Sequence, residues 1–178
     1  MKGVLIIKIL ALDQARNGAW SIFDASNQEL LAYGEWSFPA RKYDFSQAVY
    51  QITRVAMDLI KTNDIDVVFI EDTQLRQNAQ SFKKLAQLQG ALINLCEGLS
   101  VPYENVPPTR WQSYCGARGR SCKEQKSNVT SLQGQERKAS KELSLEFVRS
   151  HFGIETENDN LADAICIGWY AVNHLSKE

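Results

Sequence analysis

Residues 10–24 read LALDQARNGAWSIFD, and this stretch decides the fold. Two apolar runs enclose Asn17-Gly18, a turn signal, so the stretch predicts a β-hairpin whose first strand ends on Asp13. Residues 4–12 are dense in Ile, Leu and Val, which indicates that the first strand is central. A third strand is expected at about 29–38, and three strands joined by such short links form an antiparallel meander.

The rest of the chain alternates helical and strand-like patterns. Helices are expected at 45–62, at 78–98, from about 109, at 138–151 and at 159–175, and strands at 65–70 and 101–106. The polar stretch at about 116–137 has no apolar period and is expected to be a mobile basic loop. The order β-β-β-α-β-α-β-α-α-α predicts one α/β domain over residues 1–178. Its mixed sheet would have three antiparallel strands, then parallel strands, with helices on both faces.

The charge distribution is uneven along the chain. The formal net charge is −1, which by itself gives no sign of nucleic-acid binding. Residues 115–142 nevertheless carry seven Lys or Arg against three Glu, a pattern that suits a basic arm beside an acidic site. The four cysteines form no CxxC pair, so zinc is not expected, and free thiols are favoured over a disulfide. No segment is long enough to span a membrane, and a cytoplasmic location is expected.

Acidic side chains stand at three places where they can meet. Asp13 ends the first strand and Glu71 follows the fourth, and acids that end adjacent parallel strands converge at one edge of a sheet. Asp163 lies near the start of the last helix, with Asp159 and Asn160 four and three residues before it on the same helix face. Taken singly, Asp13 is also explained as a turn residue and Asp159 as a helix cap.

Clustered carboxylates repel one another unless a cation lies among them. Oxygen ligands without His or Cys favour Mg²⁺, with Mn²⁺ as a substitute. Two such ions can activate a water and stabilise the leaving oxygen of a phosphodiester. The acids therefore predict a metal-dependent phosphodiesterase site with two ions.

The motifs together resemble the RuvC-type Holliday junction resolvases of the RNase H-like superfamily. The matching pieces, in chain order, are LALDQARNGAWSIFD, VVFIED, the stretch from NAQSF to PPTRW, KASKELSLEFV and LADAICIGWYA. DQARNG and ADAICIG look most like the phage-encoded branch of this family, whose members would act in a bacterial cell. The resemblance implies a homodimer that nicks branched DNA, especially four-way junctions, at symmetric positions in recombination or repair. The products would carry 5′-phosphate and 3′-hydroxyl ends.

Carried over residue by residue, the resemblance places the family's catalytic acids on Asp13, Glu71 and Asp163. The fourth ligand position, usually an Asp and sometimes a His, falls on Asn160. Three explanations stay open: the amide coordinates the metal weakly, Asp159 replaces it, or Asn160 is an inactivating substitution.

The resemblance also points to DNA-contacting residues. The position of the family's aromatic wedge is held by Gln74, beside Arg76. Lys138 and Lys141 are candidates for holding the scissile phosphate, with Lys141 preferred. A second family lysine falls near Trp111, where Arg110 could replace it. The basic loop adds a group of expected phosphate contacts, Arg118, Arg120, Lys123 and Lys126. Each of these charges is also explained as an ordinary solvated side chain.

The function expected from these residues is a Mg²⁺-dependent, structure-selective DNA endonuclease. Alternatives are a nuclease of the same fold that acts on forks, flaps or RNA–DNA hybrids, and a catalytically silent junction-binding protein. A sugar-kinase or actin-like ATPase also has an Asp after its first strand. It needs a second such domain and a Gly-rich phosphate loop, and 178 residues supply neither.

Overall fold

The predicted meander forms one half of a five-stranded mixed sheet. The computed structural model describes residues 7–74, 78–118 and 129–175, with side chains from residue 141 onward in the last range. The sheet order is β3-β2-β1-β4-β5. The strands are β1 (Lys8–Asp13), β2 (Asn17–Asp24), β3 (Glu29–Ser37), β4 (Val67–Glu71) and β5 (Tyr103–Val106). β1, β2 and β3 pair antiparallel, whereas β4 and β5 continue the sheet parallel to β1. The predicted α/β fold class is confirmed.

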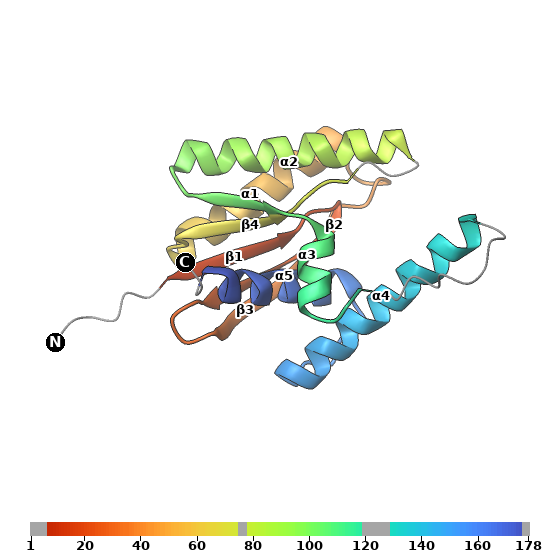
Figure 1. The fold of residues 1–178 in the computed structure, drawn as a ribbon. Coiled ribbons are helices and arrows are strands. Elements are labelled where there is room, and N and C mark those ends of the chain that lie inside the picture. The colour runs from red at the N-terminus through yellow and green to blue at the C-terminus, as the bar shows by residue number, and fades with distance from the viewer. Residues whose placement is uncertain (1–6, 75–77, 119–128, 176–178) are drawn as a thin grey trace.

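Helices cover both faces of this sheet (Figure 1). α1 (Phe45–Asn63) and α2 (Ala79–Leu99) lie on one face. The other face carries α3 (Pro108–Tyr114), α4 (Val129–Phe152) and α5 (Asp159–Leu175). Alternation along β1 divides the core, because Ile9 and Ala11 pack towards α5 while Leu10 and Leu12 pack towards α1 and α2. No helix within the described ranges has the length and apolar character needed to cross a membrane.

Asn17-Gly18 belongs to a strand, so its prediction as the hairpin turn is wrong. Residues 14–16 connect β1 to β2, and Asn17 is already the first residue of β2. A Cβ at Gly18 would lie 2.5 Å from the backbone oxygen of Asp13 and 2.8 Å from the Trp36 ring. Glycine is needed here because three strands pack closely. A tight turn also favours glycine, so the two cases look alike in the sequence.

α4 begins at Val129, nine residues before the predicted start, so the predicted loop is wrong for residues 129–137. The segment lacks an apolar period because most of this helix lies away from the sheet (Figure 1). Arg120, Lys123, Lys126 and Arg76 lie outside the described residues, and Lys138 is described only by its backbone.

The strand directions define one edge of the sheet, which we call the carboxyl edge. β1, β4 and β5 all end there, and β3 ends there too because it runs parallel to β1. Asp13 and Glu71 are the last residues of their strands. Both acids therefore reach the carboxyl edge from neighbouring positions in the sheet.

Candidate active site

Asp13 and Glu71 lie side by side at the carboxyl edge. The parallel register pairs Leu12 with Ile70, so the next residues of β1 and β4 are these two acids. Their side chains lie within hydrogen-bonding reach of each other, and this closeness raises the pKa of Asp13. Asp13 is only 7% exposed. The sequence prediction that two strand-end acids meet is matched by this geometry.

α5 brings Asp163 to the same place. The hydroxyl of Ser21 on β2 donates a buried hydrogen bond of 2.8 Å to the backbone oxygen of Ala164. Gly168 lets the helix lie directly on β2, because a Cβ there would be 2.5 Å from the Phe23 ring. This close contact of α5 with the sheet holds Asp163 within electrostatic reach of both Asp13 and Glu71.

Burial and mutual repulsion make these carboxyl groups hard to ionise. Burial raises the pKa of Asp13 well above its ordinary value, and Glu71 and Asp163 raise it further. Burial likewise raises the pKa of Asp163 to about 7, with a further contribution from Glu71. A hydrogen bond from Ser144 and the charge of Lys141 lower the Asp163 pKa in part. Such shifts cluster at functional sites, although structural networks also produce them.

Two residues that the sequence analysis did not assign to the site hold the end of β4. The indole Nε1 of Trp111, a fully buried residue, donates to Glu71 Oε1 at 3.2 Å. Gln14 Nε2 donates to the backbone oxygen of Glu71 at 2.7 Å and to Thr73 Oγ1 at 3.1 Å. A signal for Trp111 was present, since it occupies the place of a family lysine. Gln14 follows Asp13 directly but carries no motif.

α4 adds a lysine and a serine to the acids. Lys141 forms an ion pair with Asp159, and its charge also acts on Asp13 and Asp163. Ser144, one turn further along α4, is fully buried and hydrogen-bonds to Asp163. Lys141 therefore lies at the acids as expected. Ser144 was missed, although its spacing of three residues from Lys141 places both on one helix face.

Asn160 is bonded to the sheet. Its side-chain Nδ2 donates to the backbone oxygen of Asn17, at 2.8 Å. The neighbouring Asn158 accepts from the backbone N–H groups of Asn160 and Leu161, and its own amide contacts Glu35 on β3. The start of α5 is therefore joined to β2 and β3 by two side-chain amides.

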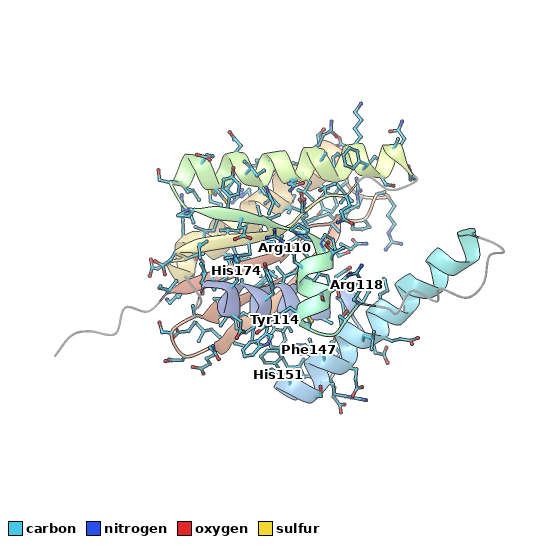
Figure 2. The ribbon with its side chains drawn as sticks, viewed as in Figure 1. Arg110, Tyr114, Arg118, Phe147, His151 and His174 are labelled. Atoms are coloured by element: carbon cyan, nitrogen blue, oxygen red, sulfur yellow. The ribbon has the colours of Figure 1, made fainter. Side chains whose placement is uncertain are left out.

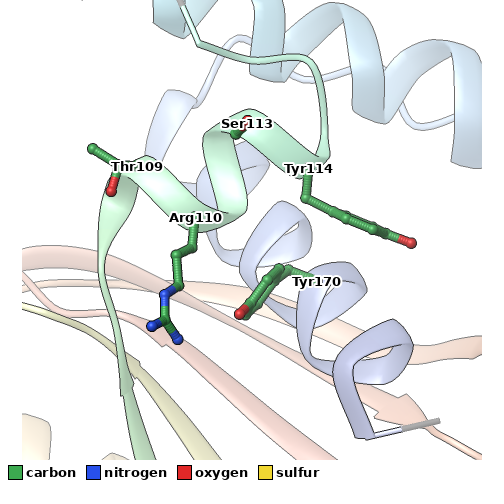
Figure 3. A pocket seen from close by; sticks show the side chains of 5 residues that line it. All are labelled: Thr109, Arg110, Ser113, Tyr114 and Tyr170. Atoms are coloured by element: carbon green, nitrogen blue, oxygen red, sulfur yellow. The ribbon is translucent and has the colours of Figure 1, made fainter. Parts of the chain in front are cut away.

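The other predicted DNA-contacting residues in the described chain are exposed. Gln74 and Arg118 are exposed, and Figure 2 shows Arg118 beyond the end of α3. Arg110 lies next to the buried Trp111, yet its own side chain extends beside Tyr170 (Figure 3). With Thr109, Ser113 and Tyr114 these two side chains line an open surface hollow. Arg110 therefore faces a different surface from the one that Trp111 contacts.

The donor atoms at the acids are all oxygens. Asp163 Oδ1 and Gln14 Oε1 are buried and have no hydrogen-bond partner within the described part of the chain. Among those same residues, no group of three or more His, Cys, Asp and Glu is already spaced to hold a metal ion. A cation between Asp13 and Glu71 would relieve the repulsion between the two carboxylates. The residue types fit a hard divalent cation.

Comparison with known proteins identifies the fold. No protein-family model matches the chain, and no curated protein matches it. RuvC of Thermus thermophilus, solved with a Holliday junction substrate, superposes with a TM-score of 0.70 at 14% identity, covering 96% of each chain. The yeast mitochondrial Holliday junction resolvase Ydc2 gives 0.55 at 13% identity, covering 97% of this chain and 82% of that one. Fowlpox virus resolvase, solved with Holliday junction DNA, gives 0.54 at 14% identity, covering 95% and 99%. The chain has the RuvC-type, RNase H-like fold.

Proposed function

We propose that this chain is a metal-dependent DNA endonuclease that resolves four-way and other branched junctions by paired symmetric nicks. One observation carries the proposal: Asp13, Glu71 and Asp163, from two strands and a helix, meet at the carboxyl edge with the pKa values of both aspartates raised. The fold is shared with proteins that resolve Holliday junctions, two of which were solved with junction DNA. These likenesses support the substrate class for a site whose chemistry already suits phosphodiesters.

On this proposal Asp13, Glu71 and Asp163 hold Mg²⁺, or Mn²⁺ as a substitute, with two ions per site. The orphaned Oδ1 of Asp163 and Oε1 of Gln14 support the assignment, because buried oxygens without donors suit a cation. When bound, the ions would supply the Lewis acidity that activates a water and stabilises the leaving oxygen. Asn160 uses Nδ2 for the Asn17 carbonyl and Asp159 uses Oδ2 for Lys141, so each side chain would offer a cation its other atom, an oxygen.

The predicted DNA-contacting residues would hold the DNA. Lys141 is proposed to hold the scissile phosphate, because its charge already acts on the two aspartates. The exposed Arg118 would contact the backbone, together with Arg120, Lys123, Lys126 and Lys138. Arg110, Gln74 and Arg76 are proposed as further contacts, from their places in the sequence alone.

Two symmetric nicks need two active sites, so we propose a homodimer of single-domain chains. The products would be 5′-phosphate and 3′-hydroxyl ends. A phage-encoded protein acting in the cytoplasm of a bacterial cell is proposed from DQARNG and ADAICIG.

The test uses a mobile four-way junction, a fork, a flap and an RNA–DNA hybrid of equal length, each with 10 mM Mg²⁺ or EDTA. Metal-dependent paired nicks in the junction, absent in the Asp163→Asn variant, are expected. Preferred cleavage of the fork, flap or hybrid would replace the proposal with another RNase H-like nuclease. Tight junction binding without cleavage, even in the Asn160→Asp variant, would indicate a silent binding protein.

A further inference from the structure

A second basic surface lies on the opposite side of the sheet from α4 and Arg118. It consists of exposed residues from two places in the chain, the loop before α1 and the first turns of α2: Arg41, Lys42, Lys83 and Lys84. We call these four residues the α1–α2 patch. The site described above uses none of them.

Arg16 fixes the loop that carries half of this patch. Its guanidinium Nη1 donates to the backbone oxygens of Phe38 at 3.1 Å and Tyr43 at 2.9 Å. The same guanidinium lies 5.8 Å from the centre of the Phe45 ring. Through these two carbonyls and the ring, Arg16 holds the loop against the β1–β2 connection. That connection directly follows Asp13.

Two of the patch lysines, Lys42 and Lys84, lie over aromatic rings. Lys84 Nζ lies 5.9 Å from the centre of the Phe45 ring, which Arg16 also contacts. Lys42 Nζ lies 5.3 Å from the centre of the Tyr43 ring. The Phe45 ring thus joins the second turn of α2 to the segment that Arg16 anchors. A cation over a ring keeps its N–H groups available for an anion.

Within the described residues Lys42 and Lys84 form no ion pair with a carboxylate. Asp44, two residues after Lys42 in the sequence, accepts the Gln47 N–H at 2.8 Å as the cap of α1. The other acids of these helices, Asp58 and Glu97, belong to their second halves. The patch therefore presents an excess of positive charge to solvent.

The topology places the patch at the carboxyl edge. β3 ends there, so the loop that follows it lies there too, and α2 begins shortly after β4 reaches the same edge. α1 and α2 cover one face of the sheet, while α4 and α5 cover the other (Figure 1). The acids at the edge thus have Lys141 and Arg118 on one side and the α1–α2 patch on the other.

We infer that the α1–α2 patch binds the phosphate backbone of a second duplex arm of a branched DNA. The inference rests on the proposed function and deepens it. A straight duplex that lies along the α4 side leaves the patch without a phosphate partner. A junction branches at the acids, so it presents one arm to each face. The structure thereby assigns selectivity for branched DNA to a pair of basic surfaces within one chain.

The test measures binding of a four-way junction and of a linear duplex of equal length, in EDTA, over a salt series. For the Lys42→Glu/Lys84→Glu variant, junction affinity is expected to fall roughly tenfold or more. The slope of log affinity against log salt should drop by about two, because two phosphate contacts are lost. Linear-duplex affinity should change less than about twofold. Arg54→Glu/Lys61→Glu, the same charge change on exposed residues further along α1, is the control and should bind the junction almost as wild type does.

Equal losses on junction and duplex would overturn the inference, since the patch would then be a general phosphate contact. Unchanged junction binding would overturn it as well. If charge reversal prevents folding, Lys42→Gln/Lys84→Gln replaces it with the same expected selectivity and a smaller loss. The proposed function is judged separately by cleavage of the junction by wild-type protein in Mg²⁺. A wild type that cuts junctions while the variants keep full selectivity refutes only the inference.

Discussion

The side-chain amide of Asn160 donates a hydrogen bond of 2.8 Å to the backbone carbonyl of Asn17, which joins the first turn of α5 to the start of β2. Only an N–H or O–H donor can make this bond, and an ionised aspartate has neither. Asn160 therefore has a structural reason to be an amide at a position where the resemblance implies a charged ligand.

The Asn160→Asp variant is expected to be less stable than wild type by about 1–3 kcal/mol, because a carboxylate oxygen would face the Asn17 carbonyl. Urea unfolding without metal measures this. Asn173→Asp is the matched control, because Asn173 donates to the Trp169 carbonyl within α5 alone and does not join the helix to the sheet. Unchanged stability of Asn160→Asp would contradict the structural role, and a gain of junction cleavage would restore this position as a metal ligand.

The stability of the metal-free protein should fall as pH rises. Burial raises the pKa of Asp163 to about 7, above its unfolded value, so the native state binds more protons between about pH 4 and pH 7. The stabilising proton is present at the low end of this window and is lost as pH rises through the folded pKa, which costs on the order of 4 kcal/mol.

Thermal unfolding in EDTA from pH 5 to pH 8 measures this slope. Asp163→Asn should flatten it and unfold at a higher temperature than wild type at pH 8, because the amide cannot ionise. Asp58→Asn, a change at an exposed carboxylate on α1, should leave the slope as it is. A wild-type protein that becomes more stable as pH rises would refute the assignment.

Trp111→Phe tests the positioning of Glu71. The change keeps a buried ring and removes the indole N–H that donates to Glu71. Loss of such an outer partner should lower the rate of junction cleavage roughly tenfold, with unchanged junction binding. Trp36→Phe removes a comparable indole bond, to the Ala15 carbonyl at 2.8 Å, in the other core. Equal loss of cleavage in both variants would indicate general destabilisation.

Lys141→Ala removes a cation whose charge acts on the acids. Because Lys141 lowers the pKa values of Asp13 and Asp163, its loss should raise both. Single-turnover cleavage at pH 7 should fall roughly 10²-fold, as expected for the loss of an electrostatic contact to the reacting phosphate. Arg149→Ala breaks an exposed ion pair with Glu146 on the same helix and should cut normally. Equal rates for the two variants would remove Lys141 from the site.

Gly18→Ala and Gly90→Ala should have opposite effects. A Cβ at Gly18 meets the Asp13 carbonyl and the Trp36 ring, so the change should cost about 1–3 kcal/mol. Gly90 is in α2 with no neighbouring atom within 4 Å of a new Cβ, so alanine there should add about 0.5–1 kcal/mol. Denaturant midpoints measure both. A stable Gly18→Ala protein would show that the strands can separate at this point.

Several elements follow from local patterns alone. The alternation and apolar density of residues 10–24 predict the hairpin, and the three- and four-residue apolar spacing predicts α1, α2 and α5, because these periods record which side of an element is buried. The predicted start of α4 is nine residues too late because its first turns carry no apolar stripe. Gly18 was misplaced in a turn because close strand packing and a tight turn require the same residue.

The candidate site was likewise predicted only in part. Strand ends were enough to predict that Asp13 and Glu71 meet, since parallel strands share one edge. The family resemblance added Asp163 to them. The sequence analysis missed Trp111, Gln14 and Ser144, because each belongs to the site only through a contact with a distant part of the chain. Trp111 and its partner Glu71 are 40 residues apart, and Asn160 and Asn17 are 143 apart. The sequence by itself determined which residues could bear charge at the carboxyl edge. Only the tertiary structure decided which of them are buried, which lie against one another, and that Asn160 bonds to the sheet. Burial and hydrogen-bond partners depend on packing that no local pattern encodes.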